Sequence, residues 1–154
     1  MRIVAVADVH GNEEALRRVL QAESARHVFC LGDGVREYET LSAEYPDREF
    51  HIVCGNCDWA GNYPTVGLTS LSGKRILFLH GHTKFVKRTL EPALALAREN
   101  AADLLLFGHT HCSCAARDGA VLACNPGSLG YNGTYAVLSW DGADSAITVE
   151  KKES

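Results

Sequence analysis

Long apolar runs are missing from this sequence. No stretch approaches the ~18 consecutive apolar residues that a membrane-spanning helix requires. The chain also does not begin with a charged segment followed by an apolar core, which is the pattern of a secretory signal. These absences argue against a membrane protein and predict a cytoplasmic one.

Linkers, repeats and low-complexity segments are absent as well. A chain of 154 residues can bury a sizeable core without disulfides, so we expect a single domain over residues 1–154. The net charge of −4 argues against general binding to nucleic acids or anionic membranes. Six cysteines occur in a chain that does not resemble a short secreted scaffold, so we expect reduced thiols, most of them packed as small hydrophobes.

The first third of the sequence alternates short β-branched apolar runs with amphipathic segments. This alternation predicts a parallel sheet with right-handed crossovers. The expected elements are strand 3–7, helix 13–24, strand 27–31, helix 36–44 and strand 50–54.

The later part predicts mostly short strands. Residues 65–71 and 74–79 flank Ser72-Gly73 as a hairpin, and a helix is expected over 84–99, kinked or split at Pro92. We interpret the whole as an early, mainly parallel strand set packed against a late, mainly antiparallel one, with helices outside. The remaining expected segments are strands 103–107, 113–117, 121–124, a terminal hairpin of 135–140 with 146–151, and frayed residues 151–154.

Polar residues follow five of the expected strands. The clearest case is Asp8-Val9-His10 after the first strand, where residues i and i+2 of an extended chain face the same space. A buried carboxylate and imidazole need a partner, which a metal ion would supply, and open α/β sheets bind ligands at the carboxyl ends of their strands. The five sets are Asp8 with His10, Asp33, Asn56, His80 with His82, and His109 with His111.

A single polar residue after a strand is usually a turn or cap residue. Five together indicate a site, because the strand ends of packed sheets converge. Carboxylate, imidazole and amide ligands favour Mn, Fe, Zn, Ni or Co. Seven ligands from these eight residues would exceed the four of a structural zinc site and indicate two ions, which one carboxylate can bridge.

The ordered motifs Asp8-Val9-His10-Gly11-Asn12, Gly32-Asp33, Gly55-Asn56-Cys57-Asp58, His80-Gly81-His82 and Gly108-His109-Thr110-His111 resemble those of the calcineurin-like metallophosphoesterases. With Asn125-Pro126-Gly127-Ser128, the chain is similar to the small single-domain prokaryotic phosphodiesterases of that superfamily. The resemblance implies a four-layer α/β/β/α sandwich of two packed mixed sheets with helices outside.

The resemblance also assigns each ligand to one of the two ions. Spacing alone does not decide which ion His109 binds and which ion His111 binds. It implies two divalent ions, with Mn expected first and Ni, Fe, Zn, Co or Mg as alternatives. Asp33 would bridge them. The first ion would be held by Asp8, His10 and His111, and the second by Asn56, His80 and His109.

The reaction implied is hydrolysis of phosphoesters, above all phosphodiesters, by a metal-activated hydroxide that attacks phosphorus in line. The expected substrate is a small phosphodiester or a nucleotide-like molecule. Many members have a histidine at the position of Cys57 that protonates the leaving group, although the small branch commonly has cysteine there. His82 is an alternative donor or substrate contact, and Asp58 is expected to orient other residues. Because no residue is an obvious proton donor for the leaving group, the rate should depend on leaving-group pKa, and aryl esters should react faster than alkyl esters.

Two other functions remain open. One is phosphomonoester hydrolysis at the same site. The other is a non-catalytic scaffold resembling a retromer subunit of the same superfamily, although scaffold versions tend to lose metal ligands and this chain has all of them. A homo-oligomer through Tyr131, Tyr135 and Trp140 is also left open, with core packing as the alternative for these three residues.

Overall fold

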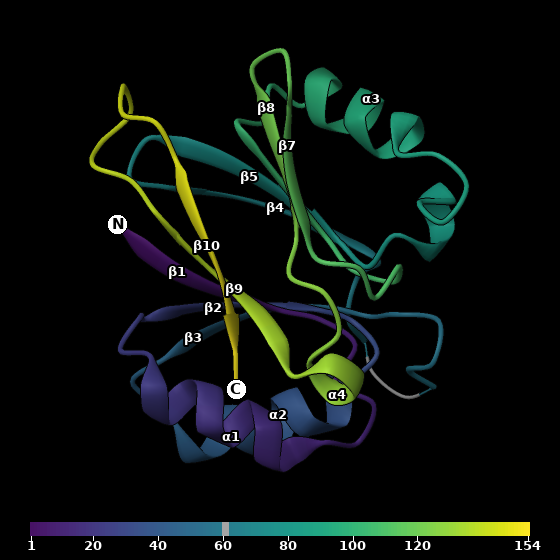
Figure 1. Cartoon of the computed structure of the whole chain (residues 1–154), viewed down its shortest axis with the longest axis vertical. Coiled ribbons are helices and arrows are strands. Elements are labelled where there is room, and N and C mark those ends of the chain that lie inside the picture. The colour runs from purple at the N-terminus through teal and green to yellow at the C-terminus, as the bar shows by residue number, and fades with distance from the viewer. Residues whose placement is uncertain (60–61) are drawn as a thin grey trace.

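The computed structural model describes residues 1–59 and 62–154. Two five-stranded sheets pack face to face, and helices cover their outer faces (Figure 1). The α/β/β/α sandwich predicted from the sequence is therefore confirmed.

The first sheet has the strand order β10-β9-β1-β2-β3. Its parallel part is β1 (Arg2–Val6), β2 (His27–Leu31) and β3 (Glu49–Val53), connected by α1 (Glu13–Ala22) and α2 (Val35–Glu44). This part agrees with the predicted alternation. The C-terminal strands β9 (Thr134–Ser139) and β10 (Thr148–Glu153) extend the same sheet, with β9 antiparallel to β1.

The second sheet has the order β4-β5-β6-β8-β7. Its central strands β5 (Lys74–Leu79), β6 (Leu104–Phe107) and β8 (Val121–Asn125) are parallel, and only the edge strands β4 (Val66–Leu71) and β7 (Cys114–Asp118) are antiparallel. The prediction of a mainly antiparallel late set is wrong. The terminal hairpin, marginal by itself, instead pairs with the open edge of β1.

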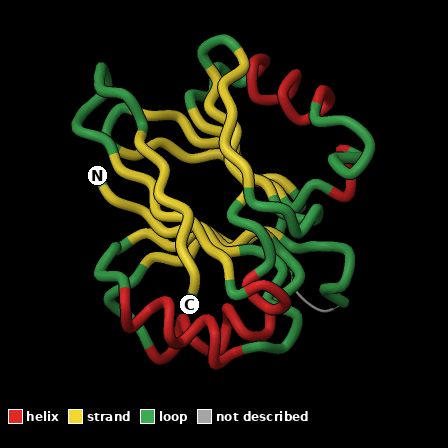
Figure 2. Tube along the Cα trace, in the orientation of Figure 1, coloured by secondary structure: helices red, strands yellow, loops and turns green. Residues whose placement is uncertain are grey.

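Three apolar layers hold the sandwich together. Along β1, Ile3 and Ala5 face the second sheet, whereas Val4 and Val6 face the layer that contains α1 and α2. Burial on both faces explains why β1 is apolar without alternation. A third apolar layer lies between the second sheet and α3 (Glu91–Glu99), and Figure 2 shows the helices confined to the outside.

Several local predictions are wrong. Within the segment 84–99 the long helix is limited to α3, and the short η1 (His82–Lys84) ends where the predicted helix was to begin. Pro92 lies in the first turn of α3, where its missing N–H costs nothing. The short α4 (Leu129–Asn132) was not predicted. The C-terminus is not frayed, since β10 extends to Glu153 and the Ser154 N–H donates to the Gly133 carbonyl.

All six cysteines are unpaired, as expected for reduced thiols. Only Cys30 and Cys124 are buried, so the expectation that most of the cysteines pack as small hydrophobes is wrong; Cys57, Cys112 and Cys114 are exposed. In the described ranges, every helix is too short or too polar to cross a membrane.

Candidate metal centre

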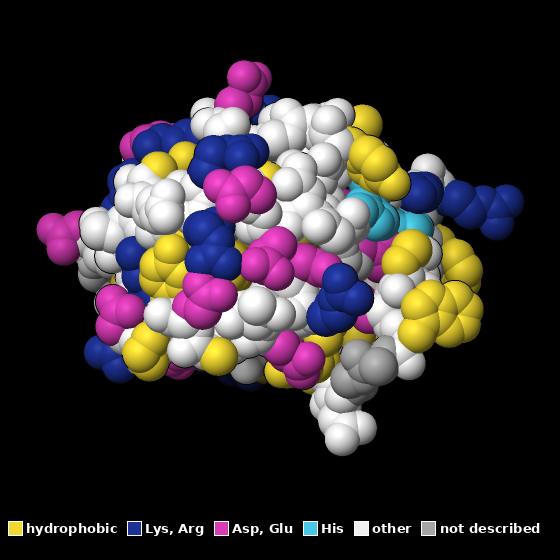
Figure 3. All heavy atoms as spheres, turned by 90° about the horizontal axis from the view of Figure 1, so that it is seen from below, with side chains coloured by type: hydrophobic (Ala, Val, Ile, Leu, Met, Phe, Trp, Pro, Cys, Tyr) yellow, Lys and Arg dark blue, Asp and Glu magenta, His cyan; other side chains and the backbone are white. Residues whose placement is uncertain are grey.

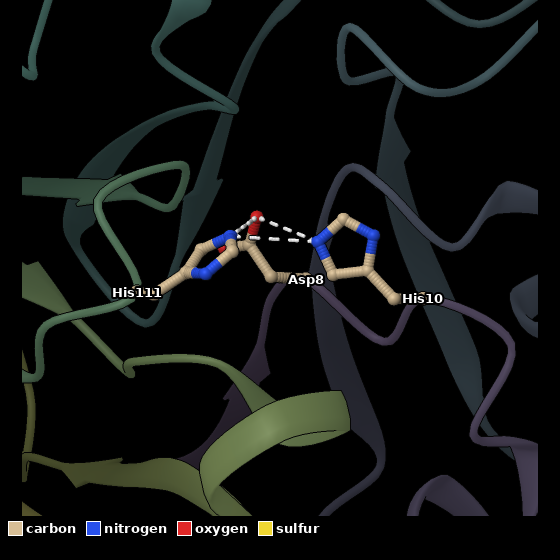
Figure 4. Close-up of side chains that lie close together, drawn as sticks. All are labelled: Asp8, His10 and His111. Carbon is tan, nitrogen blue, oxygen red and sulfur yellow. Dashed lines mark hydrogen bonds and ion pairs between the residues drawn. The ribbon is translucent and has the colours of Figure 1, made fainter.

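The predicted site residues gather at one edge of the sandwich in two groups. In the first group, the Nε2 atoms of His10 and His111 lie 3.4 Å apart. The Asp8 Oδ1 atom lies 3.2 Å from the His111 Nε2 and 3.8 Å from the His10 Nε2 (Figure 4). These three side chains come from the ends of β1 and β6, and their donor atoms face one point.

The second group is centred on His80. Its Nε2 atom lies 3.1 Å from the His109 Nδ1, 3.2 Å from the Asn56 Oδ1 and 3.5 Å from the Asp33 Oδ2. The Nδ1 atom of His80 is 2.7 Å from the Leu31 carbonyl, which can only accept, so Nδ1 carries the proton. The lone pair on Nε2 is therefore directed into the group.

Asp33 lies between the two groups. Its Oδ2 atom, next to His80, is also 3.8 Å from the His10 Nε2. Its Oδ1 atom accepts a hydrogen bond from the Cys57 N–H at 2.8 Å. A Cβ at Gly55 would lie 2.1 Å from this oxygen, so the close approach requires glycine.

Backbone pairing brings the loops after β1 and β2 together. The Asp8 N–H donates to the Gly32 carbonyl at 3.1 Å, and the His10 N–H donates to the Asp33 carbonyl at 2.9 Å. Asp8 and His10 have φ angles of 54° and 47°, so they face one space through left-handed turns and not, as we predicted, through extended alternation. Five of the eight described non-glycine residues with positive φ belong to the site, which concentrates backbone strain there; they are Asp8, His10, Asp33, His109 and His111.

Asp58 holds this loop arrangement in place. Its Oδ2 atom accepts from the N–H groups of Asp33 at 2.8 Å and Gly55 at 2.7 Å. Its Oδ1 atom accepts from Gly34 and Val35, both at 3.0 Å, at the start of α2. Asp58 therefore orients the loops after β2 and β3, and it is in neither donor group.

Burial lowers the pKa of three of the site imidazoles, those of His80, His109 and His111. Burial, followed by the neighbouring His80, lowers the pKa of His109 to about 4. Burial also lowers the pKa of His80 and of His111. For Asp33, burial raises the pKa, but His80 and the Cys57 N–H outweigh it, and the net pKa is lowered. The site thus offers unprotonated nitrogens and an ionised carboxylate, the forms that bind cations.

Asp8 shows most clearly that the donor set fits cations. Its carboxylate is fully buried; Oδ2 accepts from the His109 N–H at 2.9 Å, and Oδ1 has no hydrogen-bond partner. Burial, then the charge of Asp33 among smaller effects, raises its pKa to about 7. A buried carboxylate oxygen without a partner is costly, and a divalent ion among the donors would compensate it. Two carboxylates, four imidazoles and an amide oxygen suit two borderline ions.

Two of the predicted residues lie beside these groups. The ring of His82 is centred 5.4 Å from that of His80, and its Nδ1 atom is buried without a hydrogen-bond partner. Cys57 is exposed and near His10 and Asp33. Burial and the neighbouring Asp33 raise the pKa of its thiol, which keeps it protonated at neutral pH.

Tyr131 was not predicted to belong to the site. Its ring is centred 4.9 Å from that of His10 and 5.3 Å from that of His111, and the residue is 68% exposed. The Ser128 Oγ fixes α4 by accepting from the Tyr131 N–H and donating to the Asp8 carbonyl. The only sequence signal was its position three residues after the Gly-Ser pair, at the first turn of a capped helix. Tyr135 and Trp140, in contrast, are core residues.

An open cleft of ≈ 680 Å³ adjoins the centre. Exposed aromatic side chains, one arginine and four carboxylates, Asp33 among them, surround it. Figure 3 shows histidine side chains at the surface, bordered by hydrophobic, basic and acidic side chains. The lining includes Arg36, Glu37, Glu39, Asp58, Trp59 and Tyr131.

Asp58→Asn tests the loop arrangement. The amide has one accepting oxygen, and its NH2 group would face backbone donors, so we expect the free energy of unfolding to fall by about 1–3 kcal/mol. Metal affinity should fall about 10- to 100-fold, as is usual when a residue that supports ligands is lost. Urea denaturation and metal titration measure both effects, with the exposed Asp144→Asn as the control. Equal stability of the two variants would contradict this role.

Asp8→Asn tests the cost of the buried carboxylate. Because the folded pKa is raised from 3.8 to about 7, the folded state holds a proton that the unfolded chain releases. Stability of the metal-free protein therefore falls as the pH rises through this range. At pH 8 the metal-free variant should be about 1–3 kcal/mol more stable than the wild type, with little difference below pH 4. Urea denaturation at both pH values measures this, and a less stable variant at pH 8 would overturn the argument.

Comparisons with known proteins agree with this geometry. Residues 1–143 match the model of the calcineurin-like phosphoesterase superfamily domain. The chain is 33% identical to the probable metallophosphoesterase YsnB of Bacillus subtilis, over 84% of this chain and 75% of that protein. It is 31% identical to phosphodiesterase YfcE of Escherichia coli, with 92% and 89% of the two chains covered.

The name of a third relative refers to protein sorting and not to phosphoester hydrolysis. The chain is 29% identical to vacuolar protein sorting-associated protein 29 of Schizosaccharomyces pombe, over 83% of this chain and 72% of that protein. Together with the match over residues 1–143, these similarities show that the chain belongs to the calcineurin-like phosphoesterase superfamily.

Proposed function

We propose that this protein is a phosphodiesterase that uses two divalent metal ions. The observation that carries the proposal is the position of the Asp33 carboxylate, whose Oδ2 atom faces His10 of one donor group and His80 of the other. A carboxylate placed between two sets of lone pairs is suited to bridging two cations. The name of the phosphodiesterase relative YfcE supports the same function.

In this proposal the first ion is held by Asp8, His10 and His111, and the second by Asn56, His80 and His109. Mn is our first choice, with Ni, Fe, Zn, Co or Mg as alternatives. When bound, such a pair supplies a water of lowered pKa and positive charge for the phosphoryl oxygens. The chain itself contributes rigid positioning through Asp58 and a fixed His80 tautomer.

Charge around the cleft favours diesters over monoesters. Glu37, Glu39 and Asp58 line the cleft, and Arg36 is the only arginine or lysine on its lining among the described residues. A phosphodiester carries one negative charge, whereas a monoester carries up to two, so the carboxylates repel the monoester more strongly. Tyr131 and Trp59 also offer flat apolar surfaces for a second ester substituent.

Two residues are proposed to act on the leaving group. His82 can hold a proton on its unpartnered Nδ1 atom near the second donor group. The protonated Cys57 thiol is a weaker acid, because its pKa is raised by burial and Asp33. A weak proton donor leaves the departing oxygen to carry charge, so aryl esters should be cleaved faster than alkyl esters.

The decisive experiment measures hydrolysis of bis-p-nitrophenyl phosphate and p-nitrophenyl phosphate by chelator-stripped protein resupplied with Mn, Ni, Zn or Mg. We expect metal-dependent turnover that favours the diester. Asp33→Asn and His109→Ala should lower kcat by a factor on the order of 10² or more, since loss of a ligand should cost at least as much as loss of a supporting residue. The exposed Glu99→Gln is the control.

Other results would redirect the proposal. Preference for the monoester would favour a phosphomonoesterase at the same site. Absence of turnover with every metal, in a folded protein that binds metal, would favour the non-catalytic scaffold. Similarity to the vacuolar protein sorting relative is the reason to consider that alternative. Wild-type turnover in Asp33→Asn would contradict the bridging role.

Tyr131 is proposed to contact the substrate. Removing its ring in Tyr131→Ala should raise KM for the aryl diester about 2- to 10-fold, the range for one aromatic contact. Tyr131→Phe should behave like the wild type, because the ring and not the hydroxyl makes the contact. A fall in kcat without a change in KM would contradict a binding role.

A further inference from the structure

A third group of potential ligands lies away from the proposed catalytic edge. His27 is the first residue of β2, and Glu49 and His51 lie on the neighbouring edge strand β3. His27 is paired with Glu49 in the sheet register. The catalytic donors, in contrast, follow the carboxyl ends of strands.

These three side chains occupy the face of β2 and β3 that packs against the second sheet. His27 shares this face with Phe29, and His51 shares it with Val53, both members of the core between the sheets. The His51 ring stacks on that of Phe29 with centroids 4.4 Å apart, which fixes its orientation. Three polar side chains therefore lie at positions where the alternation of faces along β2 and β3 predicts apolar side chains.

The donor atoms converge on one point. The His27 Nδ1 atom is 3.1 Å from the His51 Nε2. The Glu49 Oε2 atom lies 3.5 Å from the His27 Nδ1, and the Glu49 Oε1 atom lies 3.7 Å from the His51 Nε2; one ligand atom from each residue lies within 4.8 Å of the other two. If the three side chains only formed a chain of hydrogen bonds, each histidine would use a different ring nitrogen for each of its two partners. Here a single nitrogen of each histidine faces both the other histidine and Glu49.

The spacing suits a transition-metal ion. Ligands about 2.0–2.2 Å from a tetrahedral zinc ion are about 3.3–3.6 Å apart, close to the three distances observed. Burial lowers the pKa of His51 and keeps its ring unprotonated at neutral pH. The Glu49 side chain is 51% exposed, against 12% for each histidine, so the trio is open to solvent on its side.

We propose that His27, Glu49 and His51 bind a Zn²⁺ ion that links edge strand β3 to β2, with a fourth position open to water. This site is independent of the proposed hydrolytic centre. Three protein ligands predict exchangeable binding, weaker than that of a closed four-ligand site.

The test uses the full chain, stripped of metal and dialysed against a range of Zn²⁺ concentrations, with bound zinc measured by mass spectrometry. Wild type should bind one equivalent more than Glu49→Gln and His51→Gln over part of that range, and Zn²⁺ affinity at this site should fall at least tenfold in either variant. His51→Gln also removes the stacking on Phe29, so Glu49→Gln is the variant expected to leave the fold intact. Glu99→Gln, with the same change of charge on another exposed residue, should match the wild type.

NMR of the imidazole nitrogens gives a second measurement. Zn²⁺ should shift the signals of His27 Nδ1 and His51 Nε2 in the wild type and leave them unshifted in Glu49→Gln at the same concentration. Metal-dependent hydrolysis should be the same in wild type and Glu49→Gln, which separates this site from the catalytic proposal. Equal zinc uptake by wild type and both variants, or unshifted imidazole signals in the wild type, would overturn the inference.

Discussion

The site depends on continued pairing of the chain beyond the ends of β1 and β2. Two backbone hydrogen bonds, from Asp8 to Gly32 and from His10 to Asp33, hold the loops after these strands side by side. The Asp58 carboxylate then binds the loop after β2 to the loop after β3. With backbone groups fixed in this way, the side chains on these loops have little freedom to separate.

This arrangement is costly for the polypeptide alone. Left-handed backbone angles at five site residues store strain, and burial of Asp8 leaves an oxygen without a partner. Both costs fall on the same few residues, at the point where the two donor groups meet. A bound cation would offset the electrostatic cost of burying the Asp8 carboxylate. A metal centre that lowers stability when empty is an expected trade-off between stability and function.

Sequence patterns predicted the fold best where they were local and repeated. The apolar strands, the helices α1 and α2, and the hairpin of β4 and β5 follow from periodicity and turn residues. The predicted kink at Pro92 is absent because a proline harms the interior of a helix but suits its first turn, and α3 begins at Glu91. The terminal hairpin was assigned to the wrong sheet because pairing partners distant in sequence leave no local signal.

The position of each donor after an apolar strand was enough to predict which residues gather at the candidate metal centre, since strand ends converge. Strand spacing left the division of these donors open and the family resemblance suggested it, whereas the packed structure places Asp33 between His10 and His80. It also brought Tyr131 to the site through α4 and joined His27 to Glu49 and His51 across two strands. The physical reason is that periodicity encodes which face of an element is buried, whereas distances between side chains from different elements depend on sheet register and packing, which no single segment contains.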